Sequence, residues 1–379
     1  MALRHTHLYE YHRLHGKLVD FSGFEMPVWF EGVIPEHNAV RNAVGIFDVS
    51  HMGRVFAMGP DAEVFVDSLV TNDVSNLNSM EALYTVMCND NGGIVDDLTV
   101  YRLSEQQFLL VPNAGNREKD YSWLLSHSKV FDVELKEVSD NIAMMAVQGP
   151  RAEETLQKVA SKPLSEVKRF KCREIDLGGY KALVARTGYT GEDGFETYLW
   201  DTPLTNPVKA LDLWEKILFA GKEFGIKPCG LGARDSLRLE AGFSLYGNDI
   251  DEETNPFEAR LGFVVKLKKK RPFLGREALV RINREGLKRR LVGLKIVGRG
   301  IPRHGYEIWK EGRQIGHVTS GGFSPTLDVG IAMGYVASEY AELGIEVEIK
   351  VRERFAEGKI VKSHPFYDEA EYGYKREKT

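Results

Sequence analysis

The sequence predicts an α+β protein that ends in a separate all-β domain. From residue 84 onward, strand-like runs alternate with Gly, Asn and Asp turns, and segments of helical period lie between them. After about residue 261 the helical pattern gives way to short β-rich runs spaced by Gly and Pro turns. A chain of 379 residues has room for two or three domains.

The first 260 residues contain both kinds of element. Apolar residues at helical spacing favour helices, whereas alternating or continuously apolar runs favour strands. The segments expected to be helical are 9–19, 36–44, 62–69, 116–127, 152–159, 207–224 and 233–239. The segments expected to be extended are 46–58, 84–88, 94–102, 107–112, 130–138, 142–147, 181–186 and 195–200.

The C-terminal part is expected to form a small sandwich or barrel, because its short strands are regularly spaced. The expected strands are 290–296, 307–310, 313–319, 332–336 and 346–350. A basic segment, residues 264–303, lies at the start of this part. It holds 14 Lys and Arg against only Glu277 and Glu285, a local charge of +12 in a chain of net charge -5.

Composition excludes several classes of protein. The chain is 43% apolar, too much for a disordered protein, and its net negative charge argues against a general nucleic-acid binder. Cys88, Cys172 and Cys229 lie far apart, so neither a disulfide framework nor a zinc ribbon is expected. There is no metal-binding motif, signal peptide or transmembrane run, and we expect a cytoplasmic protein without metal or nucleotide that does not associate with membranes.

The segment 91–102 is the first candidate for chemistry. Two glycines form a turn and a strand follows, in which Asp96 shares a face with core residues. A carboxylate there is more simply a cap of the turn. Asp97 shares the other face with Thr99 and Tyr101, a set that could face a ligand, although carboxylates near turns are common.

The segment 186–196 joins two expected strands through a glycine-rich loop whose backbone could approach a ligand closely. It matches no nucleotide-binding motif, and an ordinary hairpin loop explains it equally well. Glu196 leaves the loop and enters a strand. Its two oxygens could accept a planar pair of N–H donors, such as an aminopyrimidine ring presents.

The segment 230–240 is expected to begin a helix, with Asp235 near its start as a capping residue. Arg234 and Arg238 are four residues apart on one helical face and could grip carboxylates. Pairing with internal Asp or Glu is at least as good an interpretation. His51 alone would more often be a structural histidine.

Together these motifs resemble the T-protein of the glycine cleavage system, a tetrahydrofolate-dependent aminomethyltransferase. The resemblance runs nearly end to end through segments 20–27, 47–53, 92–98, 188–196, 230–240, 246–250 and 318–321. The main competitors are relatives that only bind folate or join it to a flavin oxidase. The chain lacks a flavin domain and the K-G-C-Y-x-G-Q-E stretch of the folate-binding repair proteins.

The resemblance implies a three-domain cloverleaf body around a folate channel. Its first domain would combine residues 1–53 and 139–260, its second would be the α+β insert 54–138, and its third the barrel-like residues 261–379. The implied reaction moves the methylene carbon of an aminomethyl group from the dihydrolipoyl arm of H-protein to tetrahydrofolate. The implied products are 5,10-methylenetetrahydrofolate, ammonia and dihydrolipoyl H-protein.

Residue roles also follow from the resemblance. Asp97 would be the catalytic carboxylate near N5 and N10 of the folate, and Glu196 would hold the pterin with Tyr189 nearby. The other expected folate-binding residues are Tyr84, Tyr101, Asn113, Arg234 and Tyr372. Tyr372 lies in a tail that varies within the family.

Two alternatives remain beside this function. A folate-binding regulatory or scaffold protein would share the Glu196 pocket but would not need Asp97. Nucleic-acid binding through the basic segment would require a steep salt dependence. Because H-protein is typically acidic, we instead expect the basic segment, with Lys268, Lys269 and Lys270, to dock H-protein.

Overall fold

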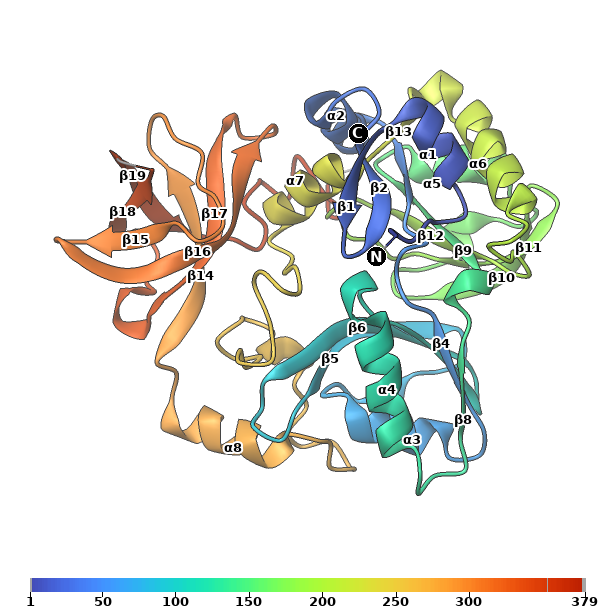
Figure 1. The fold of residues 1–379 in the computed structure, drawn as a ribbon, viewed down its shortest axis with the longest axis horizontal. Helices are drawn as coiled ribbons and strands as arrows, with labels where there is room; N and C mark the ends of the chain where they lie inside the picture. Colours follow the sequence, from blue (N-terminus) through green and yellow to red (C-terminus); the bar gives the residue numbers. More distant parts are fainter. Residues whose placement is uncertain (1, 353, 377–379) are drawn as a thin grey trace. The chain divides into compact units, whose positions relative to one another are not determined.

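The structure, a computed structural model, describes residues 2–352 and 354–376 and divides into two compact units. The first unit comprises Met1–Asp67, Val74–Tyr84 and Leu98–Arg234; the second comprises Ser68–Asp73, Thr85–Asp97 and Asp235–Thr379. Figure 1 shows the course of the chain through both. The division into three domains stays a prediction. None of the described helices has the length and apolarity needed to cross a membrane.

A six-stranded sheet forms the main core of the first unit, with strand order β10-β11-β12-β9-β3-β13. Its short strand β13 runs parallel to β3, and its other pairs are antiparallel. Apolar side chains of α5 (Ala152–Gln157) and α6 (Val208–Ala220) pack into the core of the sheet, with Trp214 fully buried. The strands are β3 (Gly45–Asp48), β9 (Ala143–Gln148), β10 (Cys172–Leu177), β11 (Tyr180–Ala185), β12 (Gly194–Leu199) and β13 (Lys227–Pro228).

The N-terminal residues add a helix and a hairpin to the first unit. Helix α1 (Tyr9–His15) ends where the Gly16 N–H binds the His12 carbonyl, and β1 (Lys17–Phe21) and β2 (Phe24–Trp29) follow. The predicted helix 9–19 is therefore wrong beyond residue 15, since glycine disfavours helix continuation and the chain turns into a strand. Helix α2 (Val33–Asn42) comes next.

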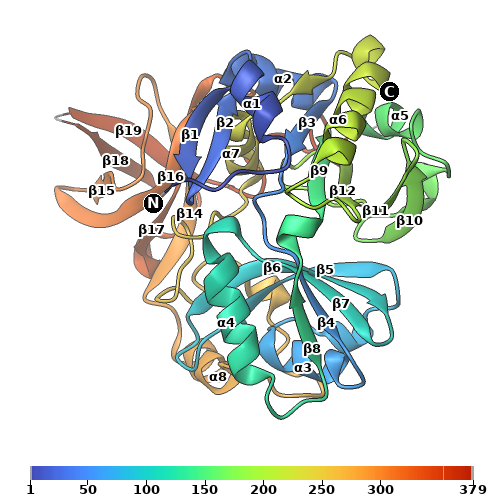
Figure 2. The ribbon, with the colours of Figure 1, turned by 45° about the vertical axis from the view of Figure 1, so that its right-hand side comes forward.

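A five-stranded sheet has the order β5-β6-β7-β4-β8, and the boundary between the units passes through β5 and β6. The pairs β6–β7, β7–β4 and β4–β8 are antiparallel. Both views place α4 against a face of this sheet (Figures 1 and 2). The elements are β4 (Val55–Met58), α3 (Ala62–Leu69), β5 (Glu81–Cys88), β6 (Ile94–Ser104), β7 (Gln107–Val111), α4 (Arg117–His127) and β8 (Glu134–Glu137).

The second unit contains a closed barrel of order β14-β17-β16-β15-β18-β19. Its interior is apolar, with Val292, Leu294 and Ile349 among the buried residues. The predicted C-terminal all-β domain is thereby confirmed. The strands are β14 (Arg289–Ile296), β15 (Glu307–Lys310), β16 (Arg313–Ser324), β17 (Val329–Ala337), β18 (Glu346–Val351) and β19 (Arg354–Val361).

Two helices precede the barrel in sequence. Helix α7 (Leu231–Ala241) crosses the unit boundary, and α8 (Arg276–Glu285) lies within the basic segment. No helix was predicted for α8, because its charges obscure a short apolar face formed by the buried Ala278 and Leu279.

Candidate active site

Glu196 lies on β12, a central strand of the six-stranded sheet. Its neighbours across the sheet are Ala185 on β11 and Ala146 on β9. Side chains alternate along a strand, so Phe195 enters the apolar core while Glu196 and Tyr198 share the opposite face. The sheet therefore fixes the base of a polar site.

A network of hydroxyl groups binds one oxygen of this carboxylate. Tyr198 Oη donates to Tyr101 Oη at 3.0 Å, and Tyr101 Oη donates to Glu196 Oε2 at 3.3 Å. Thr187 Oγ1 donates to the same Oε2 at 2.5 Å. No described residue donates a hydrogen bond to Glu196 Oε1. One oxygen is thus fixed by the protein and the other can accept a hydrogen bond from a ligand.

Burial dominates the electrostatics of this network. It raises the pKa of Glu196 above its ordinary value, while the Thr187 hydroxyl and the positive charge of Arg234 oppose the rise. Burial, reinforced by the negative charge of Glu196, raises the pKa values of Tyr101 and Tyr198 well above 10. Both phenols therefore remain protonated donors.

The glycine-rich loop between β11 and β12 is held by internal contacts, which agrees with its interpretation as a hairpin loop. Gln148 Nε2 donates to the Thr187 carbonyl at 3.1 Å, and Thr190 Oγ1 donates to Gln148 Oε1 at 2.9 Å. A Cβ on Gly188 would lie 2.0 Å from Gln148 Oε1, so a larger residue here would displace the Gln148 amide. The loop therefore presents Thr187 at a fixed position.

Arg234 is the arginine of α7 that contributes to this site. Its Cζ atom lies 4.6 Å from the centre of the Tyr189 ring, in cation–π contact, and its charge acts on Glu196. The first unit thus brings together four predicted residues, Tyr101, Tyr189, Glu196 and Arg234. Two others, Tyr84 on β5 and Asn113 before η2 (Ala114–Asn116), are half-buried.

Arg238, by contrast, is an internal residue of the second unit. It is 2% exposed and its Nη1 lies 2.8 Å from Asp249 Oδ2. The predicted capping role of Asp235 is wrong, because α7 begins four residues earlier, at Leu231. Asp235 is instead exposed in the second turn and pairs with Arg238 at 2.7 Å.

Asp97 lies on β6, where it is the last residue of the strand that belongs to the second unit, and it is 9% exposed. Burial does not alternate along this strand, because every residue from Ile94 to Leu98 is buried. The preceding turn is capped by Asn89, whose Oδ1 accepts the N–H groups of Asn91 and Gly93 at 3.0 Å. An amide seven residues before Asp96 thus caps this turn, and a capping role for Asp96 stays a prediction.

The other predicted residues lie in the second unit. Tyr372 is half-buried, with its ring centre 6.2 Å from that of Tyr367. Lys268 and Lys270 are exposed. Lys269 differs, because its Nζ donates to the carbonyls of Val70 and Asn72 at 2.8 and 2.9 Å.

Sequence analysis did not identify Thr187, Tyr198 or Gln148. The signal for Tyr198 was present, because residues two apart on a strand share a face with each other. Thr187 and Gln148 could not be found this way, since their contacts depend on the conformation of the loop.

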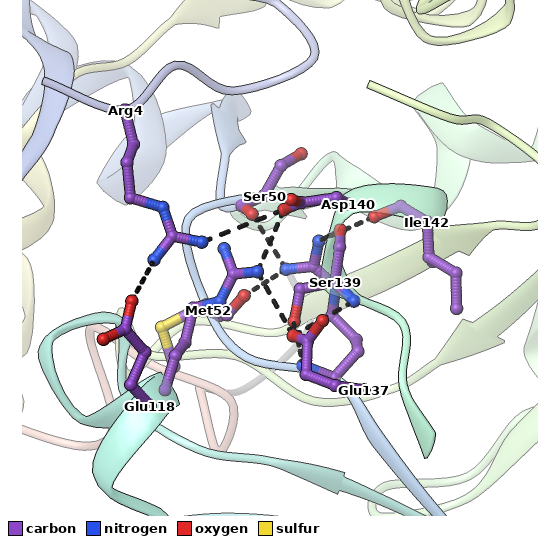
Figure 3. A network of polar contacts seen from close by, with 10 residues as sticks. Arg4, Ser50, Met52, Glu118, Glu137, Ser139, Asp140 and Ile142 are labelled. Atoms are coloured by element: carbon purple, nitrogen blue, oxygen red, sulfur yellow. Dashed lines mark hydrogen bonds and ion pairs between the residues drawn. The ribbon is translucent and has the colours of Figure 1, made fainter. Parts of the chain in front are cut away.

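A second polar network fixes the segment that follows β3. Arg54 is fully buried, and its guanidinium donates to the carbonyls of Ser50 and Ile142 at 2.8 Å, and also to those of Met52 and Ser139. Burial, reinforced by the charge of Arg117, lowers the pKa of Arg54 to about 9. Figure 3 shows this network, in which Arg4 also reaches Glu118 and Asp140. Such a guanidinium, bound on several sides by carbonyls, serves the fold.

Within the described residues, no group of three or more His, Cys, Asp or Glu side chains is arranged to hold a metal ion. The polar groups of the Glu196 site are suited to hydrogen bonding with an organic ligand.

Comparison with known proteins decides the family. The GCVT N-terminal domain matches residues 8–269, and the glycine cleavage T-protein C-terminal barrel domain matches residues 289–368. The chain belongs to the glycine cleavage T-protein family.

Its relatives match over nearly the whole length. An aminomethyltransferase of Caldanaerobacter subterraneus subsp. tengcongensis is 50% identical over 361 residues, covering 95% of each chain. One of Clostridium botulinum is 51% identical over 345 residues, covering 91% of this chain and 92% of that protein. The crystal structure of glycine cleavage system aminomethyltransferase T from Bartonella henselae superposes with a TM-score of 0.89 at 35% identity, covering 98% and 99% of the two chains.

These matches confirm the resemblance seen in the sequence. The chain is an aminomethyltransferase of the glycine cleavage system, with the α+β fold and C-terminal barrel expected.

Proposed function

We propose that this protein takes the aminomethyl group from the dihydrolipoyl arm of H-protein and transfers its methylene carbon to tetrahydrofolate. The carbon loses its bonds to sulfur and to the amino nitrogen and gains bonds to N5 and N10 of the folate. The two protons from N5 and N10 go to the lipoyl sulfur and to the leaving ammonia. No oxidant, reductant or metal is required for the balance of this reaction.

The observation that carries the folate part of the proposal is the unequal use of the two oxygens of Glu196. Oε2 accepts from Tyr101 and Thr187, while Oε1 has no donor among the described residues. A pterin presents an amino group and a ring N–H side by side, a planar donor pair that suits a carboxylate. Such donors would favour the ionised form of Glu196, against the burial that raises its pKa.

The residues around Glu196 are assigned supporting roles. Tyr101 orients the carboxylate by hydrogen bonding, and Tyr189 offers an aromatic surface held by Arg234. Tyr84, Asn113 and Tyr372 are assigned to the lining of the folate channel, on the strength of the family resemblance and their partial burial.

Asp97 is assigned the catalytic role. Loss of the lipoyl sulfur or of ammonia passes through an iminium-like cation, and a nearby carboxylate stabilises that charge and helps to move the protons from N5. The position of Asp97 is consistent with this role, because the side chain is 9% exposed and a carboxylate with little contact to water acts more strongly on a neighbouring charge.

The basic segment is assigned to docking of the acidic H-protein. Its exposed cations are Lys266, Lys268, Lys270, Arg281, Arg284, Lys288, Arg290, Lys295, Arg299 and Arg303. A surface of one sign of charge accelerates encounter with a partner of the opposite sign. Lys269 is left out of this surface, because its ammonium group is bound by two carbonyls.

The experiment that tests the function is a methylene-transfer assay with aminomethyl-loaded H-protein, in the presence and absence of tetrahydrofolate. We expect 5,10-methylenetetrahydrofolate to form only when folate is present. Folate binding without any formation of methylene-folate would contradict the enzymatic proposal and would favour a regulatory or scaffold protein.

A further inference from the structure

The residue at the start of β6 is bound on both sides by one distant segment, residues 243–254. The Ile94 N–H donates to the carbonyls of Asp251 and Thr254, both at 3.0 Å. The Ile94 carbonyl accepts from Tyr246 Oη at 3.1 Å. Ile94 is three residues before Asp97, so both backbone groups at the entrance to the catalytic strand are fixed by segment 243–254.

The same segment packs closely on the preceding turn. A Cβ on Gly93 would lie 1.7 Å from the Glu252 carbonyl oxygen, a contact that only glycine permits. Asn89 Nδ2 donates to that same oxygen at 3.1 Å. The start of β6 therefore depends on segment 243–254 for its position.

Segment 243–254 is in turn held by the carboxylate of Asp249, which is 1% exposed. Asp249 Oδ2 accepts from Arg238 Nη1 at 2.8 Å, from the Leu245 N–H at 2.9 Å and from Ser320 Oγ at 2.8 Å. Thr319 Oγ1 donates to Oδ1. One buried carboxylate thus joins α7, segment 243–254 and barrel strand β16.

A buried ion pair of this kind favours one arrangement over others, because moving either partner leaves a charge without compensation. Arg238 also donates to Ser320 Oγ at 2.9 Å and to the Phe243 carbonyl at 3.1 Å. The contacts therefore form a continuous path from the barrel to Ile94, all of it within the second unit.

We propose that Asp249, Ser320 and Tyr246 are positioning residues for the reaction, which hold the start of β6 so that the Asp97 carboxylate lies where the chemistry needs it. This rests on the catalytic role proposed for Asp97. Displacement of a reacting group by about 1 Å can cost about a hundredfold in rate, so loss of one contact in this path should lower kcat.

The chain offers a matched control on the same strand. Ser324, also on β16, donates from Oγ to Glu240 Oε1 at 2.5 Å, just as Ser320 donates to Asp249. Both serines are buried and both bind a buried carboxylate. Ser320→Ala and Ser324→Ala thus remove the same atom and the same kind of contact, but only Ser320 lies on the path to Ile94.

The test compares Tyr246→Phe, Ser320→Ala and Ser324→Ala. We expect Tyr246→Phe and Ser320→Ala to lower kcat about tenfold with KM for folate within twofold, and to speed hydrogen exchange at the amides of residues 94–97. Ser324→Ala should lower the melting temperature about as much as Ser320→Ala but leave kcat and this exchange unchanged. An equal loss of kcat in both serine variants, or unchanged kcat and exchange in Tyr246→Phe, would overturn the proposal.

A double variant separates this proposal from the role of Asp97. Adding Tyr246→Phe to Asp97→Asn should cause no further loss of kcat if Tyr246 acts through Asp97, whereas a full additional tenfold loss would overturn that path. Full activity in Asp97→Asn alone would reject the assignment of Asp97. Hydrogen exchange in Tyr246→Phe would still report whether Tyr246 holds the strand.

Discussion

Two glutamates of the first unit differ in how completely their oxygens are used. Glu36 on α2 is fully buried, and its Oε1 accepts from the N–H groups of Phe30, Glu31 and Gly32 at 2.6 to 3.0 Å. Its Oε2 accepts from the Gly230 N–H at 2.8 Å. Glu196 has donors on Oε2 only, and these are side-chain hydroxyls.

The difference separates a structural carboxylate from one suited to binding. Backbone N–H groups on both oxygens of Glu36 fix the chain before α2 and leave little capacity for a ligand. Glu196 keeps Oε1 as an acceptor on a rigid strand, so part of its hydrogen bonding waits for a ligand. The use of the oxygens therefore distinguishes the two roles, which the residue type alone does not.

The largest effect is expected at Asp97, where the change removes chemistry and spares binding. Asp97→Asn should lower methylene transfer at least a hundredfold, the scale of general acid–base catalysis, while folate affinity stays within a few-fold. Steady-state transfer assays and folate titration measure the two quantities. Undiminished turnover in this variant would reject the assigned mechanism.

The comparison of the two glutamates predicts a smaller effect, on binding. Glu196→Gln should weaken tetrahydrofolate binding roughly tenfold to a hundredfold, because a hydrogen bond to a charged group contributes about 1.5–3 kcal/mol. Glu36→Gln should leave folate affinity unchanged but lower the free energy of unfolding, since an amide nitrogen would face backbone N–H donors. Folate titration and thermal unfolding of both variants distinguish these outcomes.

The control for this pair is the reciprocal measurement. The melting temperature of Glu196→Gln should lie within a few degrees of that of the parent protein, because the substitution affects only hydrogen bonds from side-chain hydroxyl groups. If Glu36→Gln weakens folate binding as much as Glu196→Gln does, the use of the two oxygens is not what separates the roles.

Much of the fold could be predicted from the sequence, because local patterns encode it. The barrel follows from short β-rich runs, and α4 was expected at 116–127 and found at Arg117–His127. The start of α7 was placed two residues late, since its first turn contains Gly232. A Cβ there would lie 2.5 Å from Val33 Cγ2. Close packing against a residue far away in the sequence therefore explains this glycine, and helix propensity does not.

The candidate site was less accessible to sequence analysis. Period-two alternation placed Glu196 on the polar face of its strand, but the hydroxyl network joins Tyr101 to a residue 95 positions away. Only the family resemblance suggested that these residues share a site. The structure was also needed to separate the roles of Arg234, which contacts Tyr189, and Arg238, which pairs with Asp249. Their spacing alone places both on the same helical face.

His51 extends the comparison to a buried histidine. Its Nδ1 has no hydrogen-bond partner among the described residues, and its ring packs edge-on to Phe21 at 5.7 Å between centres. Burial, reinforced by the charge of Arg234, lowers the pKa of His51 from 6.5 to about 3. The group is therefore neutral in the folded protein and binds a proton more readily when unfolded.

The sign of the pH effect follows directly. The contribution of His51 is fully present above pH 6.5 and is lost as the pH falls toward 3, which amounts to about 2 kcal/mol between pH 7 and pH 5. His51→Gln should lower stability at pH 7 but reduce the loss on acidification by about that amount. Chemical denaturation at pH 7 and pH 5 measures it, and equal slopes in both proteins would contradict the prediction.

The smallest effect is expected on the basic segment. Here too, a side chain bound within the protein can be compared with side chains that are open to a partner. Lys269 has its ammonium bound by the carbonyls of Val70 and Asn72, whereas Lys268 and Lys270 are exposed. Charge reversal of Lys268 and Lys270 should raise KM for H-protein a few-fold at low salt and flatten its salt dependence, because steering by exposed charges is screened by ions. Lys269→Met should instead lower thermal stability and leave KM for H-protein unchanged.

If the double reversal changes neither KM for H-protein nor its salt dependence, the exposed lysines do not dock H-protein. A rise in KM from Lys269→Met alone would mean that docking depends on the local fold of this segment.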